Sequence, residues 1–477
     1  MFTSIYFLIF LILVWLIYLF LPGKMREGYL LLASILFIGY ISVKALVAVA
    51  VTSALVFCCA LLIEKAKKTG KSGKGIAIIC IFVFACLLVV IKNIPWAIKF
   101  VGGMGLSEDH LLRKLLLPVG FSFYSFQSIG YIYDAYNGKD EAEHNFIRFA
   151  LYMLFFPKFV SGPIERQGAF GKQLGELREV KLFESSRIWQ AVMYILWGYA
   201  LKMIVADRLA LLVNVVHKMP TAFDVSFLVI CTIFYSFQVY ADFAGYTCIA
   251  IGISKLFGLN LMNNFESPYW SATITEFWRR WHISLSSWLR DYVYIPLGGN
   301  RKGAARTYIN RYIVFAATGI WHGANWTFLV WGLFHGTFLV LESSGLLPIK
   351  KCRIKAVRCA YTLLLVMIGF IMFRADNITQ GLYYISALFG FGWSSCLGFS
   401  YAMQFVNFYY VIIYILAIVG CTELPIKIYK KLMKFETVED MPVTSEIISM
   451  VLCVVAILVS FMSLASASYN PFIYFRF

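Results

Sequence analysis

Charged side chains are scarce in this sequence. Asp, Glu, Lys and Arg supply only 14% of its 477 residues, while hydrophobic residues supply 61%. Soluble globular proteins carry about 25% charged residues, so the shortage excludes an ordinary soluble enzyme. Apolar runs of about 20 residues recur along the chain, and each is long enough to cross a bilayer as a helix. With no internal repeat and no separate soluble domain, residues 1–477 are expected to form one integral-membrane domain.

The signatures of several other protein classes are missing. The eleven cysteines include no CxxC pair, which argues against disulfides and against a zinc site. No GxSxG, HExxH or Walker A motif is present, which excludes those hydrolase, protease and nucleotide-binding arrangements. Basic residues are scattered between apolar runs instead of forming one soluble basic domain, so nucleic-acid binding is not expected. We expect neither a metal nor a resident cofactor.

The apolar runs predict an all-α polytopic fold of about 11 transmembrane helices, with further re-entrant or interfacial helices. Ser4–Leu21 lacks the cationic flank and cleavage site of a signal peptide, so it is expected to be the first span. Gly28–Ile63 is too long for one crossing and should make two, turning near Ser42–Lys44. Other expected spans are Gly75–Ile91, Leu115–Tyr136, Ile147–Val160, Trp189–Val205, Phe227–Ile253, Val357–Phe373, Phe405–Cys421 and Ile447–Leu464.

The distribution of basic residues predicts an orientation. The strongest basic run is Lys65–Lys74, and the positive-inside rule makes that loop cytoplasmic. Counting back three spans puts the N-terminus outside. The formal net charge of +17 has two readings, namely positive-inside loops or the attraction of anionic donors such as nucleotide phosphates.

Two apolar runs contain unusual residues. Ile147–Val160 is short, has Pro157 near its end and precedes an SGPIER turn, so a broken or tilted element is expected. Irregular backbone at membrane depth persists only where protein or a water-filled cavity covers it. Asp242 is the only carboxylate in Phe227–Ile253. It either pairs with neighbouring groups and sets the helix orientation, or acts directly beside a site.

Residues 275–336 hold three of the six histidines, His282, His322 and His335. In the first part of this stretch, the spacing of residues 278–292 predicts one helix. That helix is too short and too charged to span the bilayer, so we expect it to be re-entrant or interfacial. Its predicted apolar face consists of Trp278, Trp281, Leu285, Trp288 and Tyr292, and its polar stripe consists of Arg279, His282, Ser286 and Arg290. An aromatic belt with snorkelling cations is the alternative reading.

His322 and His335 lie 13 residues apart. On one straight helix they would be separated by about 20 Å along the axis and roughly 140° around it, so they could not act on one atom. Either one is chemical and the other structural, or both are structural. We favour His322 because it lies nearer the basic face. A buried neutral imidazole suits deprotonation of a hydroxyl, and a basic, aromatic mouth suits a nucleotide-bearing thioester donor, so acyl transfer is the simplest chemistry.

The segments TEFWRRWHISLSSWLRDYVYIPLGGNRKG and GIWHGANWTFLVWGLFHG closely resemble the membrane-bound O-acyltransferase (MBOAT) family. They match nearest its bacterial, alginate O-acetyltransferase-type branch, as do FFPKFVSGPIER, FRADN and PFIYFRF. The resemblance implies spans around a central funnel in a bacterial cell membrane, with His282 and His322 as the key histidines. It also implies a donor that enters from the cytoplasm and an extracytoplasmic partner that modifies a polysaccharide.

The leading hypothesis is therefore an O-acyltransferase with His322 as general base, and with His282 holding the donor thioester or assisting proton transfer. Its donor is expected to be acetyl-CoA or an acyl carrier, and its partners an SGNH-type acyltransferase, polysaccharide export machinery and membrane lipids. Donor or substrate binding is expected from Arg279, Arg280, Trp281, Ser286, Arg290, Asn325 and Trp326, and from Asp242 if it acts directly. The alternatives are D-alanyl transfer to teichoic acid and transport of lipid-linked sugars.

Overall fold

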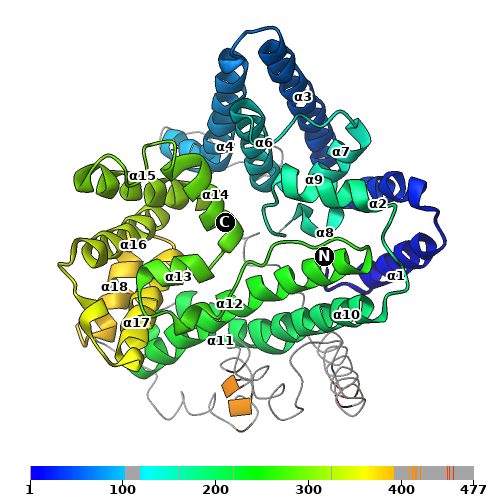
Figure 1. Ribbon diagram of the computed structural model, residues 1–477. Coiled ribbons are helices and arrows are strands. Elements are labelled where there is room, and N and C mark those ends of the chain that lie inside the picture. The colour runs from blue at the N-terminus through cyan, green and yellow to red at the C-terminus, as the bar shows by residue number, and fades with distance from the viewer. Residues whose placement is uncertain are drawn as a thin grey trace. The chain divides into compact units, whose positions relative to one another are not determined.

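A computed structural model describes residues 2–102, 119–160, 162–218, 220–323 and 325–391, with a few isolated positions beyond residue 391. Within these ranges every regular element is a helix (Figure 1), which confirms the all-α prediction. Four of the described helices are long and apolar enough to cross a membrane, so the expected count of about 11 is not confirmed. These four spans are Val43–Lys68, Lys74–Lys92, Val225–Leu256 and Lys355–Arg374. The expected spans Phe405–Cys421 and Ile447–Leu464 lie outside the described residues.

The residues divide between two compact units. The first unit comprises Met1–Ile195, Ile249–Asn263 and Ser287–Val293. The second unit comprises Leu196–Cys248, Asn264–Ser286 and Tyr294–Phe477. The chain therefore leaves the first unit and returns to it twice, and one of these returns falls inside the histidine stretch.

The N-terminal helices of the first unit pack in sequence order, α2 on α3 and α3 on α4. Ser42 separates α2 from α3, because its backbone is extended and its side chain accepts a hydrogen bond from the Ala45 amide. The predicted division of Gly28–Ile63 near Ser42–Lys44 is thus confirmed as two helices. The helices of this region are α1 (Ile5–Leu19), α2 (Arg26–Ile41), α3 (Val43–Lys68), α4 (Lys74–Gly102) and α6 (Phe121–Asn137).

The expected broken element is present between α7 (Phe146–Leu154) and α8 (Phe156–Phe159). The break falls at Phe155, two residues before Pro157, which lies in the first turn of α8. Proline is tolerated at that position because the first amides of a helix have no partner within it. After a turn, α9 (Gln167–Glu176) packs back against α7.

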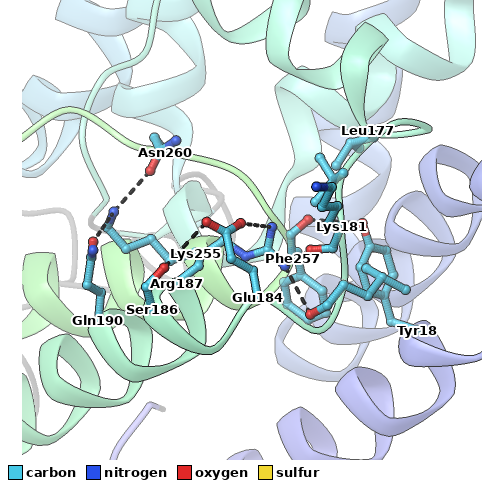
Figure 2. Close-up of polar contacts among 12 residues, drawn as sticks. Tyr18, Leu177, Lys181, Glu184, Ser186, Arg187, Gln190, Lys255, Phe257 and Asn260 are labelled. Carbon is cyan, nitrogen blue, oxygen red and sulfur yellow. Dashed lines mark hydrogen bonds and ion pairs between the residues drawn. The ribbon is translucent and has the colours of Figure 1, made fainter. Parts of the chain in front are cut away.

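Polar contacts join distant parts of the first unit (Figure 2). The Tyr18 hydroxyl of α1 donates to the Phe257 carbonyl at 2.9 Å. Lys255, on the last turn of α12 (Val225–Leu256), donates to the side chains of Gln190 at 3.3 Å and Asn260 at 3.1 Å. Gln190 belongs to α10 (Ser185–Tyr199), so these contacts fix the end of α12 to α1 and to α10.

The second unit is built on a tightly packed helix pair, α15 (Ala304–His322) and α16 (Trp326–Ser344). A Cβ on Gly332 would lie 2.3 Å from the Phe315 carbonyl oxygen, and a Cβ on Gly319 would lie 2.5 Å from that of Phe328. Only glycine permits this approach. This unit also contains α12 as far as Cys248 and the first part of α14 (Ile283–Leu289). Its other helices include the π-helix η2 (Ala200–Ala206), α11 (Asp207–Lys218), α13 (Ile274–Arg280), α17 (Lys355–Arg374) and α18 (Ile378–Leu388).

Candidate active site

The predicted single helix around His282 is wrong, because the structure has two short helices there. α13 ends at Arg280 and α14 begins at Ile283. Between them Trp281 is extended and forms an antiparallel bridge with Phe265. The Ile283 amide donates to the Asn264 carbonyl at 3.0 Å. Backbone pairing with the preceding loop thus replaces helical hydrogen bonds, and the predicted apolar face and polar stripe do not form along one helix.

His282 occupies the left-handed region, with φ of 46°. A residue with a Cβ is strained there by about 1–2 kcal/mol. Its side chain is 1% exposed, so the predicted water-facing position is also wrong. The ring meets the Phe243 ring edge-on at 4.7 Å between centroids. Burial lowers the pKa of His282 to about 3, so the imidazole is neutral at physiological pH.

His322 is buried, at the C-terminal end of α15 and four residues before α16 begins. The sequence placed it near the start of a span, and the structure places it where one helix ends. Aromatic rings surround it, with centroids 5.1 Å away for Trp331, 4.9 Å for Phe373 and 6.1 Å for Phe328. α15, α16 and α17 therefore enclose this imidazole together.

His322 and His335 do not share a straight helix, so the separation calculated from the sequence does not apply. Trp331 contacts both imidazoles, His322 at 5.1 Å and His335 at 5.5 Å between centroids. On the other side, Trp321 lies 4.6 Å from His322 and 6.3 Å from His282. All three histidines of the stretch thus belong to one series of ring contacts within the second unit.

His335 is as deeply buried as His282, with 1% of its surface exposed. It lies 5.2 Å from Trp278 of α13, and its Nε2 atom lies 2.7 Å from where a Cβ on Gly369 of α17 would stand. It therefore fills the place where α13, α16 and α17 meet. This placement agrees with the structural role predicted for it, and a chemical role has not been tested.

Arg279 and Arg280 line a charged surface pocket of about 500 Å³. Arg280 forms an ion pair with Glu276 at 2.7 Å, whereas Arg279 is exposed. Lys350 contributes a third cation from a distant part of the sequence, and sequence reasoning missed it. The full lining consists of Glu266, Thr273, Thr275, Glu276, Arg279, Arg280 and Lys350. Cations that converge on a pocket suit an anionic ligand.

Three other predicted binding residues have local structural contacts. Trp281 is buried and stacks on Phe277 with centroids 5.4 Å apart. The Ser286 hydroxyl donates to the Trp281 carbonyl at 3.2 Å. Arg290 is exposed, belongs to the first unit and pairs with Asp291 at 2.8 Å. The structure does not place these three in the Arg279 pocket, and their role in binding stays a prediction.

Asn325 and Trp326 lie at the start of α16. The Asn325 side chain accepts a hydrogen bond from the Thr327 amide at 3.1 Å, which caps the helix. It also donates to the Asp376 carbonyl at 2.8 Å. Trp326 is 55% exposed, whereas His322 is buried. A binding role for either residue is untested.

Asp242 has a buried partner that the sequence reading missed. The Lys202 ammonium lies 2.6 Å from the Asp242 carboxylate and 2.8 Å from that of Asp207. Lys202 is 2% exposed and lies in the π-helix η2, whereas Asp242 lies on α12. The pairing agrees with the reading in which Asp242 bonds to its neighbours and orients helices. A lone lysine in the expected span Trp189–Val205 was the available signal.

Several apolar helices and a series of buried histidines define an integral membrane protein with a histidine-containing site. A sequence model of MBOAT, the membrane-bound O-acyltransferase family, matches residues 30–386. The chain therefore belongs to this family of acyltransferases, as its motifs predicted.

Three relatives with assigned names show what this chain is similar to. A "Probable alginate O-acetylase AlgI" of Pseudomonas putida is 40% identical over 60% of this chain and 58% of its own length. The protein of the same name from Azotobacter vinelandii is 34% identical over 78% of this chain and 74% of its own. The "Teichoic acid D-alanyltransferase" of Streptococcus thermophilus is 33% identical over 49% of this chain and 59% of its own length. The chain thus spans somewhat under two thirds of the Pseudomonas putida relative.

Proposed function

We propose that this protein is a membrane-embedded O-acyltransferase that passes an acyl group, most simply acetyl, from a cytoplasmic thioester donor to an exported cell-surface polysaccharide. The observation that carries the proposal is His322, a buried imidazole at a helix end inside an aromatic enclosure. Family membership supports acyl transfer, and relatives named as alginate O-acetylases support a polysaccharide acceptor.

In the proposed reaction His322 is the general base. It accepts the proton of the acceptor hydroxyl as the hydroxyl oxygen attacks the thioester carbonyl carbon. The carbon–sulfur bond breaks, the thiolate leaves, and the imidazolium returns its proton to that sulfur. His282, held neutral by burial, holds the donor or assists the proton transfer. The pocket of Arg279, Arg280 and Lys350 binds the donor's phosphates.

The decisive experiment compares the purified His322→Ala variant with wild type, using labelled acetyl-CoA and an acceptor oligosaccharide. Loss of a general base lowers the rate by about 10²–10⁴-fold, while the variant should still reach the membrane in folded form. His144→Ala is the control, because the His144 side chain is 68% exposed and lies in the first unit. Normal transfer by the His322→Ala variant would refute the assignment.

D-alanyl transfer to teichoic acid is the second candidate, and the relatives named for that activity favour it. The two candidates differ in donor, so the same assay run with a D-alanyl carrier protein separates them. Binding and export of a lipid-linked sugar without consumption of either thioester would instead indicate a transporter.

The proposed surroundings are a bacterial cell membrane, with the N-terminus outside and with an SGNH-type acyltransferase and polysaccharide export machinery as extracytoplasmic partners. The basic run Lys65–Lys74 supports this orientation through the positive-inside rule. Labelling of single cysteines introduced into that run, in intact cells and in lysed cells, tests the orientation. If these cysteines react with an impermeant reagent in intact cells, the basic run lies outside and the proposed orientation is wrong.

A further inference from the structure

Helix α13 supplies most of the charged pocket in the second unit. Five of the seven lining residues lie on this helix or at its cap, namely Thr273, Thr275, Glu276, Arg279 and Arg280. The helix itself has only seven residues. Isolated helices shorter than about 12–15 residues are marginal in water. We therefore expect contacts from outside the helix to hold it in place, and to hold the pocket with it.

A buried carboxylate from another helix binds the start of α13. Glu342 lies on the last turn of α16 and is 5% exposed. Its Oε1 atom accepts a hydrogen bond from the Ile274 amide at 2.9 Å, and its Oε2 atom accepts one from the Thr275 amide at 3.5 Å. The first amides of a helix have no acceptor within it, and a charged acceptor makes a stronger hydrogen bond than a neutral one. Glu342 therefore ties α13 to the end of α16.

Two hydrogen bonds within the same turn have a different effect. The Thr273 hydroxyl accepts from the Glu276 amide at 3.0 Å. The Glu276 carboxylate accepts from the Ala272 amide at 2.8 Å and also pairs with Arg280. All of these partners lie within residues 272–280, so these contacts fix the shape of the turn, whereas Glu342 fixes its place relative to α16.

The remaining cation of the pocket follows Glu342 in the chain. Lys350 lies eight residues later, in the 3₁₀ helix η6 (Ile349–Lys351). The Leu347 amide donates to the Leu341 carbonyl at 3.1 Å, so this segment folds back onto the last turn of α16. Glu342 thus connects α13 to the segment that contains Lys350.

We propose that Glu342 is a positioning residue for the donor pocket, because it sets the spacing between the arginines of α13 and Lys350. The inference rests on the proposed function, which makes the donor's phosphates the ligand of this pocket. Cations that are displaced from their spacing bind the donor less tightly. The imidazole of His322 is enclosed by Trp331 and Phe373 instead, so loss of Glu342 should raise the donor KM more than it lowers kcat.

Net charge predicts the opposite change. Removing a negative charge beside a cationic pocket strengthens the attraction of an anion, so loss of the Glu342 charge alone would lower the donor KM. A third explanation involves Tyr361 of α17, whose hydroxyl lies beside the same carboxylate. Glu342 would then hold α16 to α17, and Tyr361→Phe would reproduce the effect of removing the carboxylate.

The test compares Glu342→Gln with Glu342→Ala in the full-length protein, with acetyl-CoA as donor. Glutamine keeps an oxygen that accepts from the Ile274 amide, whereas alanine keeps none. Positioning predicts that the donor KM rises about tenfold in the alanine variant and by less than about threefold in the glutamine variant, with kcat within about threefold of wild type in both. A KM that falls in both variants, or that rises equally in both, overturns the proposal.

Two further variants complete the comparison. Ser344→Ala is the matched control, because this hydroxyl is exposed on the same turn of α16 and donates to the Leu341 carbonyl. Tyr361→Phe should leave the donor KM unchanged, and a rise equal to that of Glu342→Ala would overturn the proposal. If the alanine variant does not fold, Glu342→Asp replaces it, since aspartate keeps the charge but has a shorter reach. Its donor KM should rise severalfold, and an unchanged KM would overturn the positioning role.

Binding of CoA, measured by titration calorimetry on the purified protein, gives a readout without catalysis. The Kd should rise about tenfold in Glu342→Ala and stay within about threefold of wild type in Glu342→Gln. An unchanged Kd in the alanine variant overturns the positioning role. Wild-type protein that binds CoA but transfers no acetyl group refutes the proposed function instead, and the binding comparison then still decides whether Glu342 positions the pocket.

Discussion

The strained backbone of His282 permits a test that separates its conformation from its chemistry. His282→Ala and His282→Gly both remove the imidazole and its contact with Phe243. They differ in the Cβ alone, and only alanine keeps the strain of a φ of 46°. Comparing the two variants therefore cancels the loss of ring packing, which is common to both.

The magnitude follows from two opposing terms. A Cβ in the left-handed region costs about 1–2 kcal/mol. Glycine loses more conformational freedom on folding, which costs about 0.5–1 kcal/mol relative to alanine. The glycine variant should therefore match or exceed the alanine variant in stability, by about 0–1.5 kcal/mol. Both variants should be inactive if the imidazole is chemical.

The assay is thermal unfolding in one detergent at one scan rate, since membrane proteins often unfold irreversibly. Ala241→Gly is the control, because Ala241 is fully buried inside the regular helix α12. There the same alanine-to-glycine change should destabilise by about 1 kcal/mol. An alanine variant at position 282 that is more stable than the glycine variant by about 1 kcal/mol, as expected at Ala241, would refute the left-handed conformation.

Three further predictions concern helix packing, buried charge and the pocket. Gly332→Ala should destabilise by about 1–3 kcal/mol in thermal unfolding, because its Cβ would lie 2.3 Å from a carbonyl oxygen, whereas Gly28→Ala, with open space around it, should not. Lys202→Met leaves two carboxylates without their buried cation and should lower the free energy of unfolding by about 3–5 kcal/mol. Lys350→Glu should raise the donor KM severalfold without lowering kcat, and the exposed Lys302→Glu control should leave both unchanged.

The features that sequence predicted well depend on local signals. Ser42 is a good helix cap, and it follows an apolar run too long for one crossing, so a division there could be read directly. Pro157 likewise predicted an interrupted element, although the break lies at Phe155. In both cases length or a single residue type carried the information, and no distant contact was needed.

The break at Trp281 and His282 could not be read in this way. Apolar residues keep helical spacing through the break, so periodicity predicts one continuous helix. What ends α13 is pairing of Trp281 with Phe265 and of Ile283 with Asn264, and these partners lie 16 to 19 residues earlier. The spacing of apolar residues within one segment carries no information about an isolated β-bridge to a residue in another segment.

The predicted separation of His322 and His335 was wrong for a different reason. The calculated separation assumed one straight helix, while α15 ends at His322 and α16 begins at Trp326. Asn325 was a usable signal, since asparagine is a preferred helix cap and a glycine precedes it by two residues. With the break recognised, residues on either side of it would have been expected to approach, as Trp331 and His322 do.

Asp242 shows how a question left open by sequence can be narrowed by physical chemistry. A lone carboxylate in an apolar span is costly unless it is paired. The same reasoning applies to Lys202, a lone cation in another expected span. Because pairing two buried residues of opposite charge reduces the free-energy cost of burying each of them, Lys202 and Asp242 could have been predicted to pair. The structure joins them at 2.6 Å across η2 and α12. The next residue on α12, Phe243, contacts His282, so this ion pair fixes the helix that supports the imidazole. We therefore expect loss of the ion pair to affect catalysis by displacing His282, and not by removing a group that reacts.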